Sequence, residues 1–138
     1  MNTNFIEIEA ISFPSDVSEL SKAEALVDKI CQSLSVNSDF YGKVLIAVTE
    51  AVNNAIKHGN KSDLSKPVHI RVSDAAESIS IEVSDEGTGF DFNNLPDPTA
   101  PDNLEKENGR GIFLMKSLAD SVDFEKEGRH VILTFSKN

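Results

Sequence analysis

Residues 50–58 read Glu-Ala-Val-Asn-Asn-Ala-Ile-Lys-His, and this stretch predicts a helix with one polar and one apolar face. Glu50 and Asn54 stand four residues apart, so on a helix both side chains lie on one face. Apolar residues fill the opposite side of the same helix. We expect this helix to run from about Asp39 to His58, with these core positions: Val44, Ala47, Val48, Ala51, Val52 and Ala55.

The flanking sequence supplies the other elements of the fold. Ser38 offers an N-cap for the helix, and Gly59 suits its end. An earlier helix is expected after Pro14, starting at Ser15 or Asp16. Apolar residues that alternate with polar ones predict strands before, between and after the helices along the chain. The expected strands are 5–11, 68–72, 79–83, 122–125 and 131–135, with a loop at 90–108 and a short helix at 111–118.

This order of elements favours an α+β fold. We expect a two-layer α/β sandwich with a mostly antiparallel, mixed sheet and the helices on one face. The length of 138 residues with 39% hydrophobic content suits a single domain over residues 1–138. Cys31 lies among apolar helical positions and is expected to be a small core residue.

The charge limits the possible partners. The net charge of −10 argues against direct nucleic-acid binding, which needs a basic surface. No stretch has the length and hydropathy of a membrane span or a signal peptide. We therefore expect a soluble, cytoplasmic protein with a protein partner and no membrane partner. A homodimer is left open, with residues 5–11 as one candidate interface.

The Glu50 and Asn54 pair could carry chemistry. A carboxylate and an amide oxygen on one helix face could activate a hydroxyl group and bind Mg²⁺, which prefers oxygen ligands. Taken alone, the pair is better explained as part of the solvated side of the helix, because such Glu and Asn pairs are common.

A second polar cluster, Asp85-Glu86-Gly87-Thr88-Gly89, follows the strand at 79–83. Strand alternation puts Asp85 on the same face as the apolar residues Ile81 and Val83. A buried carboxylate is costly unless it has a partner, and a hydrogen-bond donor of a ligand could be that partner. Gly87 and Gly89 would allow a close backbone approach. A simple turn explains the residue types of this cluster, but it does not explain why Asp85 lies on the same face as the apolar residues.

A third cluster, Asn108-Gly109-Arg110-Gly111, precedes an apolar run. Gly109 and Gly111 flank Arg110 where a helix is expected to begin, so backbone N–H groups could meet phosphate oxygens. A flexible hinge is an equally good reading of this cluster alone. The three histidines and Cys31 show no zinc-like spacing.

In order and spacing, the three clusters resemble the N, G1 and G2 boxes of the GHKL superfamily of ATP-binding domains, with the Bergerat fold. The resemblance covers about residues 35–136. Residues 49–55 (Thr-Glu-Ala-Val-Asn-Asn-Ala) look most like the anti-sigma factor serine/threonine kinases of the RsbW and SpoIIAB type.

The resemblance implies a role for each cluster, with ATP and Mg²⁺ as the cofactors. Glu50 would be the catalytic base and Asn54 a ligand of the metal. Asp85 would accept the adenine amino group. The remaining nucleotide-binding residues would be Gly87, Gly89, Gly109, Arg110 and Gly111, and residues 90–108 would form the ATP lid.

The implied function is a protein kinase that phosphorylates an anti-sigma antagonist of the STAS type and could also sequester a sigma factor. The alternative is a nucleotide-gated binding module without kinase activity. Two positions depart from many relatives: Arg129-His130 stands where a threonine lies near the adenine, and Glu107-Asn108 replaces a basic residue. The contributions of Lys106, Arg110 and His130 are left open.

Overall fold

The computed structural model describes residues 4–34, 36–89 and 107–137. Within these ranges, strands and helices follow one another along the chain much as the sequence predicts. In order, the elements are β1 (Ile6–Pro14), η1 (Val17–Glu19), α1 (Leu20–Leu34), α2 (Ser38–Asn54), η2 (Ala55–Gly59), β2 (Pro67–Asp74), β3 (Ser78–Ser84), α3 (Glu107–Leu118), β4 (Ser121–Glu125), η4 (Lys126–Gly128) and β5 (His130–Ser136).

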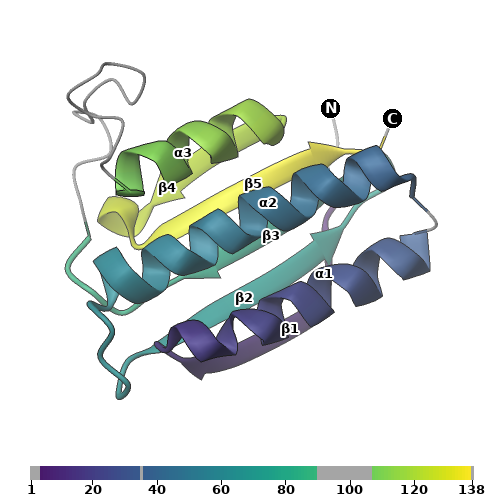
Figure 1. Ribbon diagram of the computed structural model, residues 1–138. Helices are drawn as coiled ribbons and strands as arrows, with labels where there is room; N and C mark the ends of the chain where they lie inside the picture. Colours follow the sequence, from purple (N-terminus) through teal and green to yellow (C-terminus); the bar gives the residue numbers. More distant parts are fainter. Residues whose placement is uncertain (1–3, 35, 90–106, 138) are drawn as a thin grey trace.

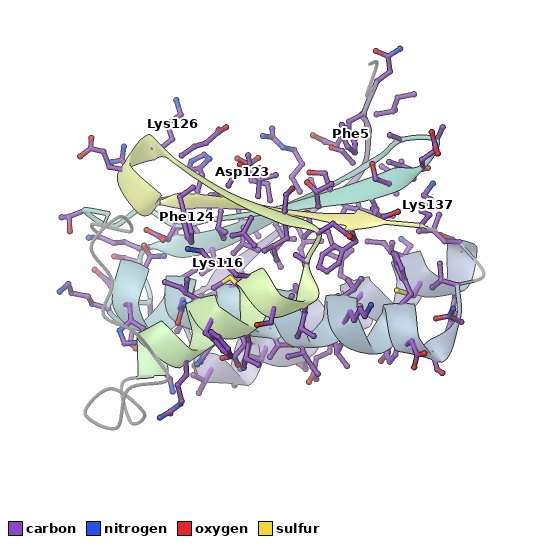
Figure 2. The ribbon with its side chains drawn as sticks, turned by 90° about the horizontal axis from the view of Figure 1, so that it is seen from above. Phe5, Lys116, Asp123, Phe124, Lys126 and Lys137 are labelled. Atoms are coloured by element: carbon purple, nitrogen blue, oxygen red, sulfur yellow. The ribbon has the colours of Figure 1, made fainter. Side chains whose placement is uncertain are left out.

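The five described strands form one sheet in the order β1-β2-β3-β5-β4, and each neighbouring pair among them is antiparallel. β2 and β3 make a hairpin, with Ile70 opposite Val83. Helices α1, α2 and α3 all cover one face of this sheet (Figure 1). Figure 2, seen from above, shows the same two layers. The expected α+β class and two-layer architecture are therefore confirmed.

The core fills the space between the two layers. Alternate residues of the strands point to the helices, as Phe124 does in Figure 2, while Asp123 points to the other side. Full burial of a large aliphatic side chain contributes about 1.5–3 kcal/mol. Cys31 is buried within this core, as expected. Other buried members are Val44, Val48, Val52, Val68, Ile70, Val72, Ile79, Ile81, Val83, Leu133 and Phe135.

The first strand differs from the simple alternation that its sequence predicts. A β-bulge between Glu7 and Glu9 shifts the register, so that Glu9 pairs with Val72 and its carboxylate contacts Lys29 of α1 at 2.8 Å. Ile6 and Ile8, expected on the half-buried face, are exposed instead. The strand also continues to Pro14, which an edge strand tolerates.

The boundaries of the second helix also differ from the expectation. Asn37, rather than Ser38, is the N-cap, and its side chain accepts the N–H of Phe40 at 2.8 Å. The α-helical part ends at Asn54, and the expected remainder is the π-helical turn η2. Such wide turns inside helices are frequent at functional sites.

The third helix begins at Glu107, four residues before the predicted start. Glu107 and Asn108 thus belong to α3 and not to the expected loop at 90–108. The remainder of that loop, 90–106, lies outside the described residues. Within the described ranges, no helix is both long enough and apolar enough to cross a membrane.

Candidate functional site

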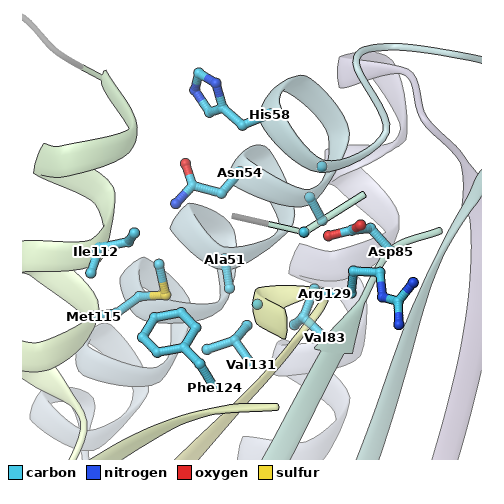
Figure 3. Close-up of a pocket in the computed structure, with 14 residues that line it drawn as sticks. Ala51, Asn54, His58, Val83, Asp85, Ile112, Met115, Phe124, Arg129 and Val131 are labelled. Carbon is cyan, nitrogen blue, oxygen red and sulfur yellow. The ribbon is translucent and has the colours of Figure 1, made fainter. Parts of the chain in front are cut away.

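A pocket opens where α2 and η2, the middle of α3 and the ends of β3, β4 and β5 come together (Figure 3). Its walls are mainly apolar, with a few polar side chains, as is typical of small-molecule sites. The polar side chains come from Asn54, His58, Asp85 and Arg129. The other lining residues are Ala51, Ala55, Gly59, Val83, Gly89, Ile112, Met115, Phe124, Gly128 and Val131.

Asp85 follows the last residue of β3 and lines this pocket with Val83, on the core side that strand alternation predicts. Within the described part of the chain, its carboxylate accepts one hydrogen bond, from the N–H of Gly87 at 2.8 Å. Desolvation by burial raises the pKa of Asp85 above its ordinary value, although the Gly87 N–H and the charges of His130 and Arg129 act in the opposite direction. The carboxylate therefore keeps acceptor capacity for a donor inside the pocket.

The fold supplies a cationic neighbour that the local sequence around Asp85 lacks. The backbone N–H of Asp85 donates to the carbonyl oxygen of Arg129 at 2.9 Å. The Arg129 side chain also lines the pocket (Figure 3). Its Nε donates to the carbonyl oxygen of Lys126 at 3.1 Å, which fixes the guanidinium beside the η4 turn.

Three glycines allow the backbone segments around Asp85 to approach closely. A Cβ atom on Gly59 would lie 2.3 Å from Oδ2 of Asp85, and one on Gly87 would lie 1.9 Å from the carbonyl oxygen of Gly59. Gly89 has φ of +86°, and its Cβ would lie 2.2 Å from the carbonyl oxygen of Glu127. Gly89 thus lines the pocket, whereas Gly87 packs behind it. A larger residue at Gly87 or Gly89 would require a shift of the backbone, and one at Gly59 would displace the Asp85 carboxylate.

The first and third clusters meet at Gly111. A Cβ atom there would lie 3.1 Å from Oε1 of Glu50 and 3.3 Å from the amide oxygen and nitrogen of Asn54. Asn54 lines the pocket, and Glu50 stands one turn earlier on the same face of α2. The fold therefore brings a carboxylate and an amide together at the edge of the pocket.

Gly109 and Arg110 lie in the first turn of α3, where the dipole of a helix favours anions. Gly109 is buried and the Arg110 side chain is exposed. Gly111 is the fifth residue of the helix rather than its start, and its nearest neighbours are the side chains of α2.

Several residues of the site were not predicted from the sequence. The apolar floor includes Met115 and Phe124, which belong to separate elements that only the tertiary fold brings together. The sequence indicates Gly59 only as the end of a helix, and no local sequence pattern predicts its contact with Asp85. Asn60, next to it, is almost fully buried, although a polar residue after a helix-ending glycine is ordinarily expected to be exposed.

Comparison with known proteins agrees with the fold. Residues 13–135 match the family model described as a histidine kinase-like ATPase domain. The chain therefore belongs to the histidine kinase-like ATPase domain family, which confirms the resemblance that the three clusters indicate.

Curated relatives include proteins named serine-protein kinase RsbW from Bacillus cereus, Bacillus thuringiensis and Bacillus anthracis. Each is 33% identical to this chain over 96 residues, which is 64% of this chain and 59% of the relative. The match thus spans about three fifths of the length of these relatives.

A solved structure has a similar fold. It is the crystal structure of the RsbU and RsbW domains of a Mycobacterium tuberculosis protein, which superimposes with a TM-score of 0.64 at 12% sequence identity. The similarity covers 95% of this chain and 32% of that chain, and it supports the fold.

Proposed function

We propose that this chain is an ATP-dependent protein kinase that phosphorylates a serine or threonine of a STAS-type anti-sigma antagonist and also sequesters a sigma factor. The observation that carries the proposal is the contact of Gly111 with Glu50 and Asn54, at the edge of a pocket that contains the half-buried Asp85. The names of the relatives from Bacillus support kinase activity.

The pocket suits an adenine nucleotide. Asp85 has acceptor capacity inside a mainly apolar cavity, so it would accept a hydrogen bond from the adenine amino group. Gly87 and Gly89 would hold the backbone around the base. Gly109 and Arg110, in the first turn of α3, would meet the phosphates. Residues 1–138 would then form one ATP-binding domain, with the segment 90–106 before α3 as its lid, acting in the cytoplasm.

The donor set at the edge of the pocket fits Mg²⁺. Asn54 offers an amide oxygen beside the carboxylate of Glu50, and these are hard oxygen ligands. Few protein ligands are needed, because this ion usually keeps waters and substrate phosphates in its shell. Asn54 would hold the metal, which when bound neutralises charge on the phosphates.

Glu50 would act as the general base. Its carboxylate takes the proton of the accepting serine or threonine hydroxyl while that oxygen bonds to the γ-phosphorus of ATP. The bond from this phosphorus to the β,γ-bridging oxygen breaks, and ADP leaves with the electron pair. Phosphoryl transfer depends mainly on positioning and charge neutralisation, so one base on a rigid helix is sufficient.

The alternative is a nucleotide-gated binding module that holds its partner without phosphorylating it. The presence of Glu50 favours the enzyme, because a protein that only senses ATP needs no base. The carboxylate is held against α3 by the contact with Gly111.

The test is incubation of the full chain with γ-labelled ATP and each STAS-type protein encoded near its gene. Label on a serine or threonine of one such protein is the expected result. If ATP binds but no candidate is labelled, and a candidate stays in complex only while ATP is present, the binding module is the better description.

A further inference from the structure

Asn60 directly follows the η2 turn, and its side chain is only 1% exposed. In the described part of the chain, Asn60 and Ser15 are the two buried polar residues. A buried amide is costly unless its hydrogen-bonding groups are paired. The pairing of Asn60 therefore indicates what this residue does.

The amide nitrogen of Asn60 forms hydrogen bonds with the residue after β1 and with the start of β2. Nδ2 donates to Oγ of Ser15 at 2.9 Å and to the carbonyl oxygens of Lys66 and Pro67, each at 3.0 Å. These contacts connect Asn60 to the Ser15 side chain and to the backbone of Lys66 and Pro67. They hold Asn60 in place but do not reach the pocket.

The amide oxygen of Asn60 faces the opposite way. Oδ1 accepts the backbone N–H of Glu86 at 2.7 Å. Glu86 is the residue after Asp85, and the N–H of Asp85 itself donates to the carbonyl oxygen of Arg129 at 2.9 Å. The peptide groups before and after the Asp85 side chain are thus both fixed, one by Arg129 and one by Asn60.

The neighbouring glycines make this anchor sensitive to small displacements. The carboxylate of Asp85 lies against the Cα of Gly59, and the Cα of Gly87 lies against the carbonyl oxygen of Gly59. Because Asn60 follows Gly59 and holds Glu86, the same hydrogen bond sets both contacts. A movement of this peptide group would change the direction of the carboxylate in the pocket.

We propose that Asn60 is a positioning residue for nucleobase selection, which holds Asp85 where its carboxylate distinguishes a 6-amino purine from a 6-oxo purine. This inference rests on the proposed function, because it takes Asp85 as the acceptor of the adenine amino group. It adds a residue outside the pocket wall that acts through Asp85.

The experiment compares the dissociation constants of ATP and inosine triphosphate for the full-length chain and three variants, together with their melting temperatures. Inosine triphosphate carries an oxygen where ATP carries the amino group, so at that position it presents an acceptor to Asp85 in place of a donor. A charged hydrogen bond at this position gives the wild type a preference for ATP of about tenfold or more.

Ser15→Ala is the matched control, because it removes one Nδ2 partner and leaves the bond between Asn60 and Glu86. It should lower the melting temperature and keep the preference for ATP. Asn60→Ala should weaken ATP binding by about tenfold, bring ATP to nearly the affinity of inosine triphosphate, and leave the inosine nucleotide little affected.

Asn60→Asp is the conservative variant, because it retains an oxygen that can accept the N–H of Glu86. We expect it to be less stable than the wild type but to retain the preference for ATP, which also keeps the test valid if Asn60→Ala fails to fold. A folded Asn60→Ala with the full preference, or an Asn60→Asp that loses the preference, would overturn the role of Asn60. A wild type that shows no preference for ATP would overturn the assignment of Asp85 and this inference with it.

Discussion

Gly111 of α3 packs against the side chain of Glu50 of α2, so closely that a Cβ atom on the glycine would lie 3.1 Å from Oε1 of the glutamate. The same Cβ would lie 3.3 Å from the amide group of Asn54. The second glycine of the third cluster thus serves to bring α3 against the polar face of α2. This contact sets where the carboxylate of Glu50 stands.

Gly111→Ala should therefore impair phosphoryl transfer more than stability. The new methyl group meets the ends of two side chains, which can move by a few tenths of an ångström, so the variant should fold. Displacement of Glu50 should slow transfer by about 10- to 100-fold. The measurement is the transfer rate at saturating ATP beside a urea unfolding curve. Gly42→Ala is the control, since its Cβ would lie more than 4 Å from every atom beyond the adjacent helix backbone, and the change within the helix should add about 1 kcal/mol of stability without altering transfer.

Gly87→Ala should be far more damaging to the fold. Its Cβ would lie 1.9 Å from the carbonyl oxygen of Gly59, which is backbone and cannot rotate away. We expect a loss of about 3 kcal/mol or more in the free energy of unfolding, at the upper end of overpacking effects. Chemical denaturation measures this loss directly. A melting temperature equal to that of the wild type would show that the turn after β3 is looser than described.

Asp85→Asn should weaken ATP binding without lowering the stability of the fold. The asparagine loses the charge that receives the adenine amino group, so the dissociation constant of ATP should rise about tenfold. Its side-chain oxygen can still accept the N–H of Gly87, and no charge remains to be desolvated. We therefore expect its stability at pH 7 to equal or exceed that of the wild type, as for many residues that bind a ligand at a cost to the fold.

The pH dependence of stability follows from the sign of the shift at Asp85. Burial raises its pKa, so between the ordinary value of 3.8 and the raised value the folded protein holds more protons than the unfolded chain. Within this window, Asp85 makes the free energy of unfolding decrease as pH rises. The stability difference between Asp85→Asn and the wild type should then grow in favour of the variant with rising pH. A difference that is the same below and above the window would contradict the shift.

Glu82 should have the opposite pH dependence. Its carboxylate, on the sheet face away from the helices, pairs with Arg71 and with Nδ1 of His130 at 2.7 Å. Burial raises the pKa of Glu82, but the hydrogen bonds from His130 and Arg71 outweigh burial and leave the pKa below its ordinary value of 4.5. Its stabilisation is thus present above pH 4.5 and is lost as pH falls through the lowered pKa.

Glu82→Gln should therefore cost about 1 kcal/mol at pH 7, a modest value because Arg71 is more than half exposed. The difference from the wild type should shrink on acidification below pH 4.5. Unfolding curves at pH 7 and near pH 3.5 provide the test. A difference that grows as the pH falls would mean that the carboxylate destabilises the sheet.

Local patterns predicted the parts of the fold that depend on local geometry. Strand period places Asp85 beside Val83 at the end of β3, and helix period places Glu50 and Asn54 on one face, because both periods are fixed by the backbone. The sequence does not predict the bulge near Glu9, because the bulge depends on pairing with β2 and on the contact with Lys29.

The close contacts of the site could not be predicted for a related reason. Gly59 and Gly87 are distant in sequence and meet only because η2 and the end of β3 pack together. The early start of α3 at Glu107 lies in a segment whose composition, with prolines and mixed charge before it, is typical of a loop. Burial of Asn60 depends on Ser15 after β1, Pro67 of β2 and Glu86 after β3, none of which is its neighbour along the chain.

The most direct test of the central claim is the effect of Glu50→Gln on ATP binding and on phosphoryl transfer in one preparation. The amide keeps the size of the side chain and its contact with Gly111 but cannot take a proton. We predict an unchanged dissociation constant for ATP and a transfer rate lower by about 10²- to 10⁴-fold. Transfer at the wild-type rate by a Glu50→Gln variant that binds ATP normally would contradict the assignment of Glu50 as the base.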